Sequence, residues 1–247
     1  MLRLLVVTAH PDDEAGAFGG TLLLYHERGV ETYVICLTPG QAASNRGGAK
    51  SVEELVMMRR EEFARSCKML KVTKGEILDF PDGGLDRIDF YSVVEKLTRR
   101  VREIRPQVIL TFGPEGGITT HPDHSMASLA GTMAFHWAAH SNRFIDQLHS
   151  GLKPHHVQKL YYGTSAFPLS DRDPVALPPA SATIEIGPYL ETKLEAFKAH
   201  TSQNPLYERF SARMRERGPQ ELFLLAAARD PQKLKAETDL FANVRED

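Results

Sequence analysis

The chain has 247 residues, of which 42% are hydrophobic and 25% are charged, and its formal net charge is -2 at pH 7. A charge balance of this kind gives no reason to expect a nucleic-acid partner. The two cysteines are too few for a disulfide framework or a thiolate zinc site, and no stretch approaches the ~20 apolar residues of a membrane span. We therefore expect a cytoplasmic protein built as one domain, residues 1–247.

The N-terminal part of the chain has the pattern of a strand, a turn, a helix and a second strand. The apolar run of residues 2–8 precedes a polar cluster, a helix expected over about 14–28 that ends at Gly29, and a strand expected over 30–37. A unit of this kind implies that its two strands pair in parallel. Open α/β sheets bind their ligands at the carboxyl ends of such strands.

The turn after the first strand carries an imidazole and three carboxylates, in the sequence Ala9-His10-Pro11-Asp12-Asp13-Glu14. Imidazole and carboxylate groups suit a divalent ion such as zinc or ferrous iron, and a carboxylate that is not a ligand can act as a base. The acidic residues could instead cap the following helix and complement its dipole. Taken alone, the cluster leaves both interpretations open.

The rest of the chain continues to alternate strands and helices. Helices are expected over 52–70, 89–104, 125–140, 189–200 and 207–217, and strands over 77–80, 108–112, 157–163, 182–186 and 221–228. Residues 38–50, 113–120 and 141–156 have no periodicity and are expected to be loops. This order predicts an α/β protein with a three-layer α/β/α, Rossmann-like fold and a mostly parallel sheet.

A second polar cluster, His121-Pro122-Asp123-His124, follows the strand expected at 108–112. Clusters at the carboxyl ends of two parallel strands can meet in one crevice. His10, Asp13 and one of the two later histidines would then supply the three protein ligands of a catalytic zinc site, and Asp12 would be free to take a proton from the attacking water. The other histidine would stabilise an oxyanion or protonate a leaving amine. This apparatus suffices for metal-assisted hydrolysis of an amide.

The two clusters resemble the motifs of the PIG-L or LmbE-like family, which are metal-dependent deacetylases of N-acetylglucosamine derivatives. Residues 9–14 match the family motif AHPDDE in full, and residues 121–124 match its second motif, HPDH. Between them, Arg59 and Glu62 resemble the Arg-x-x-Glu pattern of a family helix. The C-terminal family pattern is matched by Lys193, Ala196, His200, Ser202 and Gln203, so the resemblance spans residues 2 to about 205.

The resemblance implies catalytic and metal-binding roles for the matching positions. His10, Asp13 and His124 fall at the metal ligands of the family. Asp12 falls at its general base. His121 falls at the imidazole that stabilises the tetrahedral intermediate or acts as an acid.

Further residues have roles in orientation or substrate binding. Arg59 falls where the family binds sugar hydroxyls, and Asp123 is expected to orient a neighbouring imidazole. Asp82 follows an apolar segment and is either a turn residue or a sugar-facing carboxylate. Glu14 either complements the helix dipole or contacts substrate, and His200 is expected to be a structural hydrogen-bonding residue.

The sequence departs from the family pattern at three places. Before HPDH it has Ile118, Thr119 and Thr120 where some members carry a catalytic tyrosine, so a phenol donor is not expected there. Gln41 stands where a glutamate is usual, which removes a carboxylate contact. Glu185 stands where an aspartate is common, a change that we expect to be tolerated.

We therefore expect a zinc-dependent N-deacetylase acting on an N-acetylglucosamine derivative, with ferrous iron as the alternative metal. The alternative substrate is another amide conjugate, of thiol-sugar or antibiotic type. A nucleotide-binding Rossmann module is disfavoured because the first turn lacks the G-x-G-x-x-G phosphate cradle, and an inactive sugar-binding protein is ranked last because every catalytic position is filled. The expected partner is a small-molecule amino sugar, with no nucleic acid and no membrane span, and the chain is expected to form a homo-oligomer.

Overall fold

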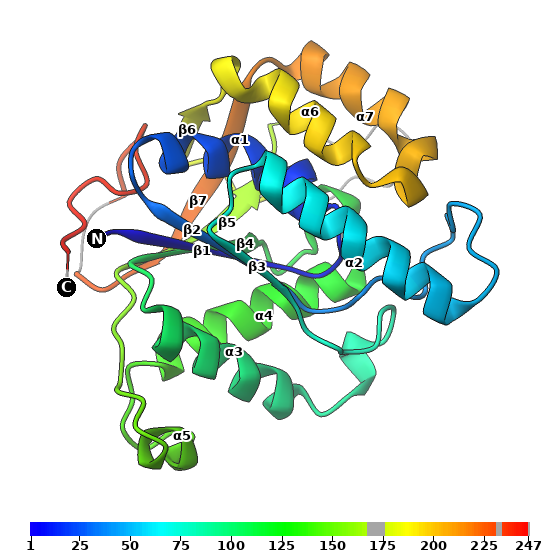
Figure 1. Cartoon of the computed structure of the whole chain (residues 1–247). Coiled ribbons are helices and arrows are strands. Elements are labelled where there is room, and N and C mark those ends of the chain that lie inside the picture. The colour runs from blue at the N-terminus through cyan, green and yellow to red at the C-terminus, as the bar shows by residue number, and fades with distance from the viewer. Residues whose placement is uncertain (167–175, 231–233, 247) are drawn as a thin grey trace.

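The computed structural model describes residues 1–166, 176–230 and 234–246, and in this part of the chain seven strands form one sheet. The strand order is β3-β2-β1-β4-β5-β7-β6 (Figure 1). The first five strands in this order are parallel, and β7 runs antiparallel between β5 and β6. The strands are β1 (Arg3–Thr8), β2 (Glu31–Cys36), β3 (Lys74–Ile77), β4 (Val108–Phe112), β5 (Lys159–Thr164), β6 (Ala182–Glu185) and β7 (Gln220–Ala228).

Helices cover both faces of the sheet (Figure 1). Four of them, α1, α2, α6 and α7, lie on one face, whereas α3, α4 and the short α5 lie on the other. The expected three-layer α/β/α fold with a mostly parallel sheet is thus confirmed. The helices are α1 (Asp13–Glu27), α2 (Val52–Met69), α3 (Phe90–Ile104), α4 (Pro122–Trp137), α5 (Ile145–His149), α6 (Leu190–Lys198) and α7 (Asn204–Arg217).

The two central strands, β1 and β4, form the middle of the core and position the site. Their apolar runs are buried along almost their whole length, as expected for parallel strands that are covered by helices on both faces. They pair directly, with Leu4 opposite Val108 and Val6 opposite Leu110. The carboxyl ends of both strands therefore lie side by side, and the segments 9–14 and 113–124 leave the sheet from adjacent positions.

The third strand lies earlier than the sequence predicts, at Lys74–Ile77 instead of 77–80. It is an edge strand that pairs with β2 over four residues. Leu78 and Phe80 are nevertheless buried, and their backbone N–H groups donate to the carbonyls of Cys36 and Leu37. Their apolar character thus reflects packing beyond the end of the strand.

The helix expected over 125–140 begins three residues earlier, at Pro122. Proline is favourable at the first helical position because the N–H that it lacks would be unsatisfied there in any case. The side chain of His121 caps the helix by accepting a hydrogen bond from the backbone N–H of Asp123. Asp123 and His124 therefore lie in the first turn of α4, and their positions are fixed by the helix.

The loop expected over 141–156 contains the short helix α5. His155 lies in this segment but is buried, and its Nε2 donates to the carbonyl of Pro106 at 2.7 Å. A lone polar residue in an aperiodic segment carries no signal for such a tertiary contact.

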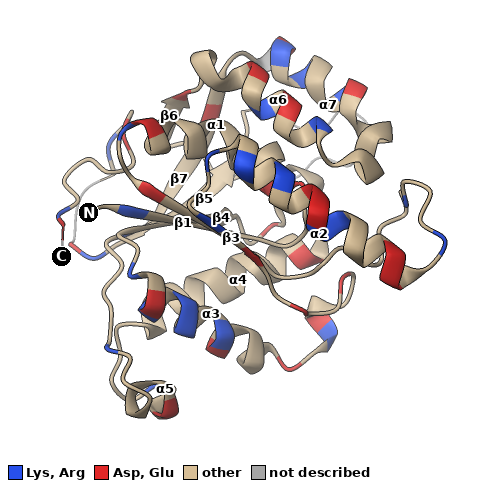
Figure 2. Ribbon diagram, viewed as in Figure 1, with Lys and Arg blue, Asp and Glu red and all other residues tan. Residues whose placement is uncertain are grey.

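In the described part of the chain, no helix is both long enough and apolar enough to cross a membrane. Basic and acidic residues are interspersed along α2, α3 and α6 (Figure 2). These helices thus present charges of both signs.

Candidate active site and metal centre

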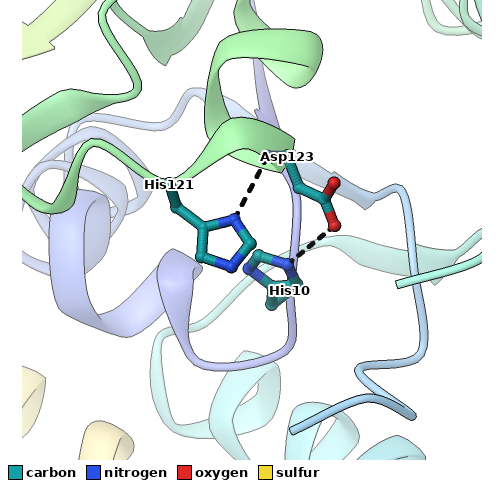
Figure 3. A group of neighbouring side chains, drawn as sticks. All are labelled: His10, His121 and Asp123. Atoms are coloured by element: carbon teal, nitrogen blue, oxygen red, sulfur yellow. Dashed lines mark hydrogen bonds and ion pairs between the residues drawn. The ribbon is translucent and has the colours of Figure 1, made fainter. Parts of the chain in front are cut away.

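The two polar clusters meet at the carboxyl ends of β1 and β4, although more than a hundred residues separate them in sequence. Figure 3 shows His10 on the turn after β1 facing His121 and Asp123 at the start of α4. The ring centroids of His10 and His121 are 4.7 Å apart, and those of His10 and His124 are 5.3 Å apart. The convergence predicted from the sequence is therefore present in the structure.

The imidazole of His124 has the tautomer that a metal ligand needs. Its Nδ1 lies 3.2 Å from the carbonyl oxygen of Gly116 and 3.1 Å from Oγ1 of Thr119. A carbonyl can only accept, so Nδ1 carries a proton and Nε2 is the ring nitrogen that is available to the site. The ring also stacks on Phe112 at 4.0 Å, which further restricts its orientation. Nε2 faces Oδ1 of Asp13 at 3.2 Å.

The imidazole of His10 is oriented from its other side. Its Nε2 lies 3.0 Å from Oδ1 of Asp82 and 3.3 Å from Oδ2 of Asp123, so it donates to this pair of carboxylates. Nδ1 is thereby directed toward Asp13, whose Oδ2 lies 3.7 Å away. A carboxylate behind a histidine ligand is a common arrangement at metal sites.

Carboxylates surround His10 in the protein without a bound ion, and they change its pKa. Burial alone lowers the pKa, but hydrogen bonds to Asp123 and Asp82 and the charge of Asp13 outweigh this effect and raise it to about 10. His10 is therefore protonated at neutral pH when no metal is bound. An ion entering the site has to displace that proton.

Asp13 divides its two carboxylate oxygens between the backbone and the site. Oδ2 accepts hydrogen bonds from the backbone N–H groups of Ala9 and His10, at 3.2 and 2.8 Å. Oδ1 faces His124. Burial raises the pKa of Asp13, but the neighbouring histidines and the backbone donors prevail and lower it. Asp13 is thus an ionised, preoriented oxygen donor.

Two overlapping sets of residues bring candidate ligand atoms within 4.8 Å of one another. The first is His10, Asp13 and His124, and the second is His10, His121 and Asp123. In the second set, both oxygens of Asp123 already accept backbone hydrogen bonds, from Gly83 at 2.6 Å and from Leu85 at 3.2 Å. His121 also uses Nδ1 as the acceptor that caps α4. The first set has the freer donor atoms.

His121 is arranged as a hydrogen-bond donor toward the site. Its Nδ1 accepts the backbone N–H of Asp123 at 3.1 Å, so the proton of the neutral ring lies on Nε2 (Figure 3). Burial and the neighbouring histidines lower the pKa of His121, which keeps the ring neutral at neutral pH. A neutral imidazole with an Nε2–H can donate to a developing oxyanion.

Asp12 is suited by its environment to accept a proton near neutral pH. Burial raises the pKa of its carboxyl group to about 6, with the Arg59 guanidinium opposing this effect. Arg59 Nη2 donates to Asp12 Oδ2 at 3.1 Å, and the same guanidinium contacts the carbonyls of Pro11 and Gly40. Arg59 is only 3% exposed, because it reaches across to the turn that carries Asp12.

Asp82 contacts the site more closely than a simple turn residue would. Besides facing His10, its Oδ2 accepts the backbone N–H of Ala42 at 2.7 Å. Asp123, predicted to orient an imidazole, lies against His10. The contacts of Asp82 and Arg59 with sugar hydroxyls stay predictions.

The model of the PIG-L family, described as GlcNAc-PI de-N-acetylase, matches residues 5–135 of this chain. This match covers more than half of the 247 residues and includes both polar clusters. The chain belongs to the PIG-L family. The family resemblance inferred from the motifs is therefore confirmed.

Relatives of this PIG-L chain carry the names of deacetylases and of an amidase. The diacetylchitobiose deacetylase of Thermococcus kodakarensis is 30% identical over 203 residues, which are 82% of this chain and 70% of that protein. The mycothiol S-conjugate amidase of Streptomyces coelicolor is 33% identical over 162 residues, 58% of this chain and 55% of that protein. In the second case the match spans little more than half of the relative.

The PIG-L fold is shared with the N,N'-diacetylchitobiose deacetylase of Pyrococcus horikoshii. The two structures superimpose with a TM-score of 0.72 and 23% sequence identity, over 90% of this chain and 83% of that one. At this identity the likeness establishes the fold.

A buried network behind the PIG-L motif was not predicted from the sequence. Glu14 lies completely buried in the first turn of α1, and its carboxylate accepts from Ser66 Oγ at 2.6 Å and faces His200 Nε2 at 2.7 Å. Burial opposes both charges, yet their attraction lowers the pKa of Glu14 and raises the pKa of His200. His200 is thus a structural hydrogen-bonding residue, as expected. The only sequence signal for the pair was that both residues match family patterns.

Proposed function

We propose that this protein is a metal-dependent hydrolase that removes the N-acetyl group from an N-acetylglucosamine derivative, with zinc as the metal. The observation that carries the proposal is the convergence of His10, Asp13 and His124 beside a carboxylate, Asp12, and a hydrogen-bond donor, His121. Membership of the PIG-L family and the names of its relatives support the same reaction.

The donor set fits a divalent ion of borderline softness. His10 Nδ1, Asp13 Oδ1 and His124 Nε2 would hold the ion, and two imidazoles with one carboxylate are typical ligands of catalytic zinc. Ferrous iron takes the same donors, so the metal has to be determined by analysis. When bound, the ion would polarise the acetyl carbonyl and lower the pKa of water beside it.

The chain's own residues account for the proton transfers. The amide and one water become a free amine and acetic acid, which ionises to acetate, so one proton has to leave the water and one has to reach the nitrogen. Asp12, with a pKa of about 6, is largely ionised at neutral pH and takes the proton of the attacking water. His121 donates its Nε2–H to the oxyanion as the tetrahedral centre forms. Asp12 then returns its proton to the leaving nitrogen.

We propose that Asp82 and Arg59 contribute to sugar recognition, as the family pattern suggests for Arg59. Arg59 is almost completely buried and donates to Asp12, so it would contact the sugar beside the proposed catalytic base. Substitution of Asp82 would test this role, because it should raise KM more than it lowers kcat.

The test of this function is acetate release by the purified, zinc-loaded protein. The panel contains free N-acetylglucosamine, diacetylchitobiose, the malate and inositol conjugates of N-acetylglucosamine, and an amide conjugate of mycothiol type. The products are identified by mass spectrometry. We expect acetate from at least one N-acetylglucosamine conjugate. Asp12→Asn should lower kcat by about 10²- to 10⁴-fold while metal content is retained, since only the base is removed. If the wild-type protein released acetate from none of the amino sugars, the proposed function would be rejected. Cleavage of the mycothiol-type conjugate alone would support the alternative.

A further inference from the structure

The backbone of Asp12 adopts a conformation that non-glycine residues avoid. Its φ is 116° and its ψ is -27°. The other non-glycine residues with positive φ in the described part of the chain have φ between 50° and 61°, within the ordinary left-handed region. A conformation of this kind persists only where the surroundings enforce it.

The conformation is unusual for the place that Asp12 occupies. Asp12 immediately precedes α1 and is its N-cap residue, but its side chain makes no capping hydrogen bond. An aspartate at this position normally has an extended backbone and accepts from the free N–H groups of the first helical turn. Here the carboxylate points instead to Arg59 and remains 17% exposed. The turn therefore keeps Asp12 away from the capping role for which its residue type is suited.

Glu14 is the group that holds this backbone. Its Oε2 accepts the backbone N–H of Asp12 at 3.0 Å. Its Oε1 is fixed by Ser66 of α2 at 2.6 Å and by His200 after α6 at 2.7 Å. Glu14 and His200 have fully buried side chains, so three elements of the fold determine where this carboxylate lies.

Arg59 holds the same turn from the opposite side, by contacts with the carbonyl of Pro11 and the carboxylate of Asp12. The metal-ligand candidate Asp13 is anchored independently, through the N–H groups of Ala9 and His10. Loss of Glu14 would thus affect the base and leave the ligand in place.

We propose that Glu14 is a positioning residue for the reaction, which with Ser66 and His200 prevents Asp12 from becoming an ordinary helix cap and so keeps its carboxylate in the site. The proposal rests on the function proposed above, because it takes Asp12 as the base. Without Glu14, the backbone of Asp12 relaxes to an extended conformation and its carboxylate turns to the N–H groups of α1.

The kinetic test compares two substitutions of Glu14 in the zinc-loaded, full-length protein. Glu14→Ala should lower kcat by about 100-fold, the cost of a misplaced catalytic group, with KM and zinc stoichiometry unchanged. Glu14→Gln should recover most of this loss, because its amide oxygen can accept from Asp12 and its NH₂ can donate to Ser66 and His200. A purely structural role predicts no such separation of kcat from KM.

The matched control is Glu221→Gln. Glu221 is also a buried carboxylate bound to α1, where it accepts the N–H groups of Gly20 and Thr21 and pairs with Lys193 at 2.6 Å, farther along the helix from Asp12. This variant should lower Tm and leave kcat unchanged. An equal loss of kcat in this variant would show that any disturbance of α1 has the same effect, and would overturn the proposal.

The structural test does not depend on activity. In a crystal structure of Glu14→Ala, φ of Asp12 should be negative and its carboxylate should bond to the first turn of α1; a positive φ in that structure overturns the proposal even if the wild type proves to have another substrate. If Glu14→Ala does not fold, Ser66→Ala removes one anchor of the carboxylate and should give a smaller loss of kcat with the same shift of Asp12. Wild-type protein that releases no acetate would reject the proposed function alone.

Discussion

Buried charges occur at both ends of the parallel sheet, but they are balanced at only one of them. At the amino end of β5, Lys159 Nζ pairs with Glu237 Oε1 at 2.6 Å, and the hydroxyl group of Tyr161 donates to the same carboxylate. One cation thus faces one anion. At the carboxyl ends of β1 and β4, three carboxylates, Asp13, Asp82 and Asp123, converge on His10.

This difference separates a structural charge cluster from a functional one. A balanced buried pair satisfies itself, and removing one partner leaves an uncompensated charge that destabilises the fold. Three carboxylates around one imidazole favour a cation at its position, which is either the proton on His10 or a metal ion. The predictions below test this contrast in both regions.

The largest effect is expected at the metal-ligand candidates. His124→Ala removes a nitrogen donor whose tautomer is set by Gly116, so zinc content should fall well below one ion per chain and acetate release should be lost. Metal analysis after gel filtration checks the first result and the acetate assay the second. His136→Ala is the control, since this histidine lies on the same helix α4 outside both candidate ligand sets and should retain zinc and activity. Full zinc content in His124→Ala would remove it from the ligand set.

The balanced pair at the other end should affect stability and not activity. Glu237→Ala leaves Lys159 buried with the Tyr161 hydroxyl as a remaining contact, and we expect unfolding to become easier by about 3 kcal/mol. Urea denaturation measures this change. Zinc binding and kcat should be those of the wild type at temperatures where the variant is folded. A loss of zinc in Glu237→Ala would contradict the separation of the two regions.

The sequence predicted most of the fold and the centre of the site because both are encoded locally. The apolar runs of β1 and β4 mark strands buried on both faces, and a polar motif follows each of them along the chain, so the convergence of His10, Asp13 and His124 could be predicted. The parallel order then brings the two motifs together.

The contacts between distant segments could not be predicted, since they leave no periodic signal. Glu14 and His200 are 186 residues apart, and neither position distinguishes an ion pair from a helix-terminal or surface residue. The position of Asp82 against His10 depends on the path of the chain after β3, which itself was predicted three residues late. The positive φ of Asp12 likewise has no signal in its residue type.

The smallest effect, and the most direct measure of the charge imbalance, is the proton that leaves when a metal binds. The pKa of His10 is raised to about 10, so in the metal-free protein the imidazole carries a proton at pH 8, whereas a metal ligand must be neutral. Metal binding at pH 8 should therefore release about one proton, and metal affinity should fall as the pH is lowered, by about tenfold per pH unit for one competing proton.

Calorimetric titration of the metal-free protein with zinc, in buffers of different ionisation enthalpy, counts this proton. Asp123→Asn provides the comparison, because the hydrogen bond to Asp123 is the largest single cause that raises the pKa of His10. In this variant the pKa should move back toward 6.5, so that less than one proton is released at pH 8. Zero release by the wild-type protein would mean that His10 is neutral before the ion arrives, and that the three carboxylates are compensated by some other means than the proton proposed here.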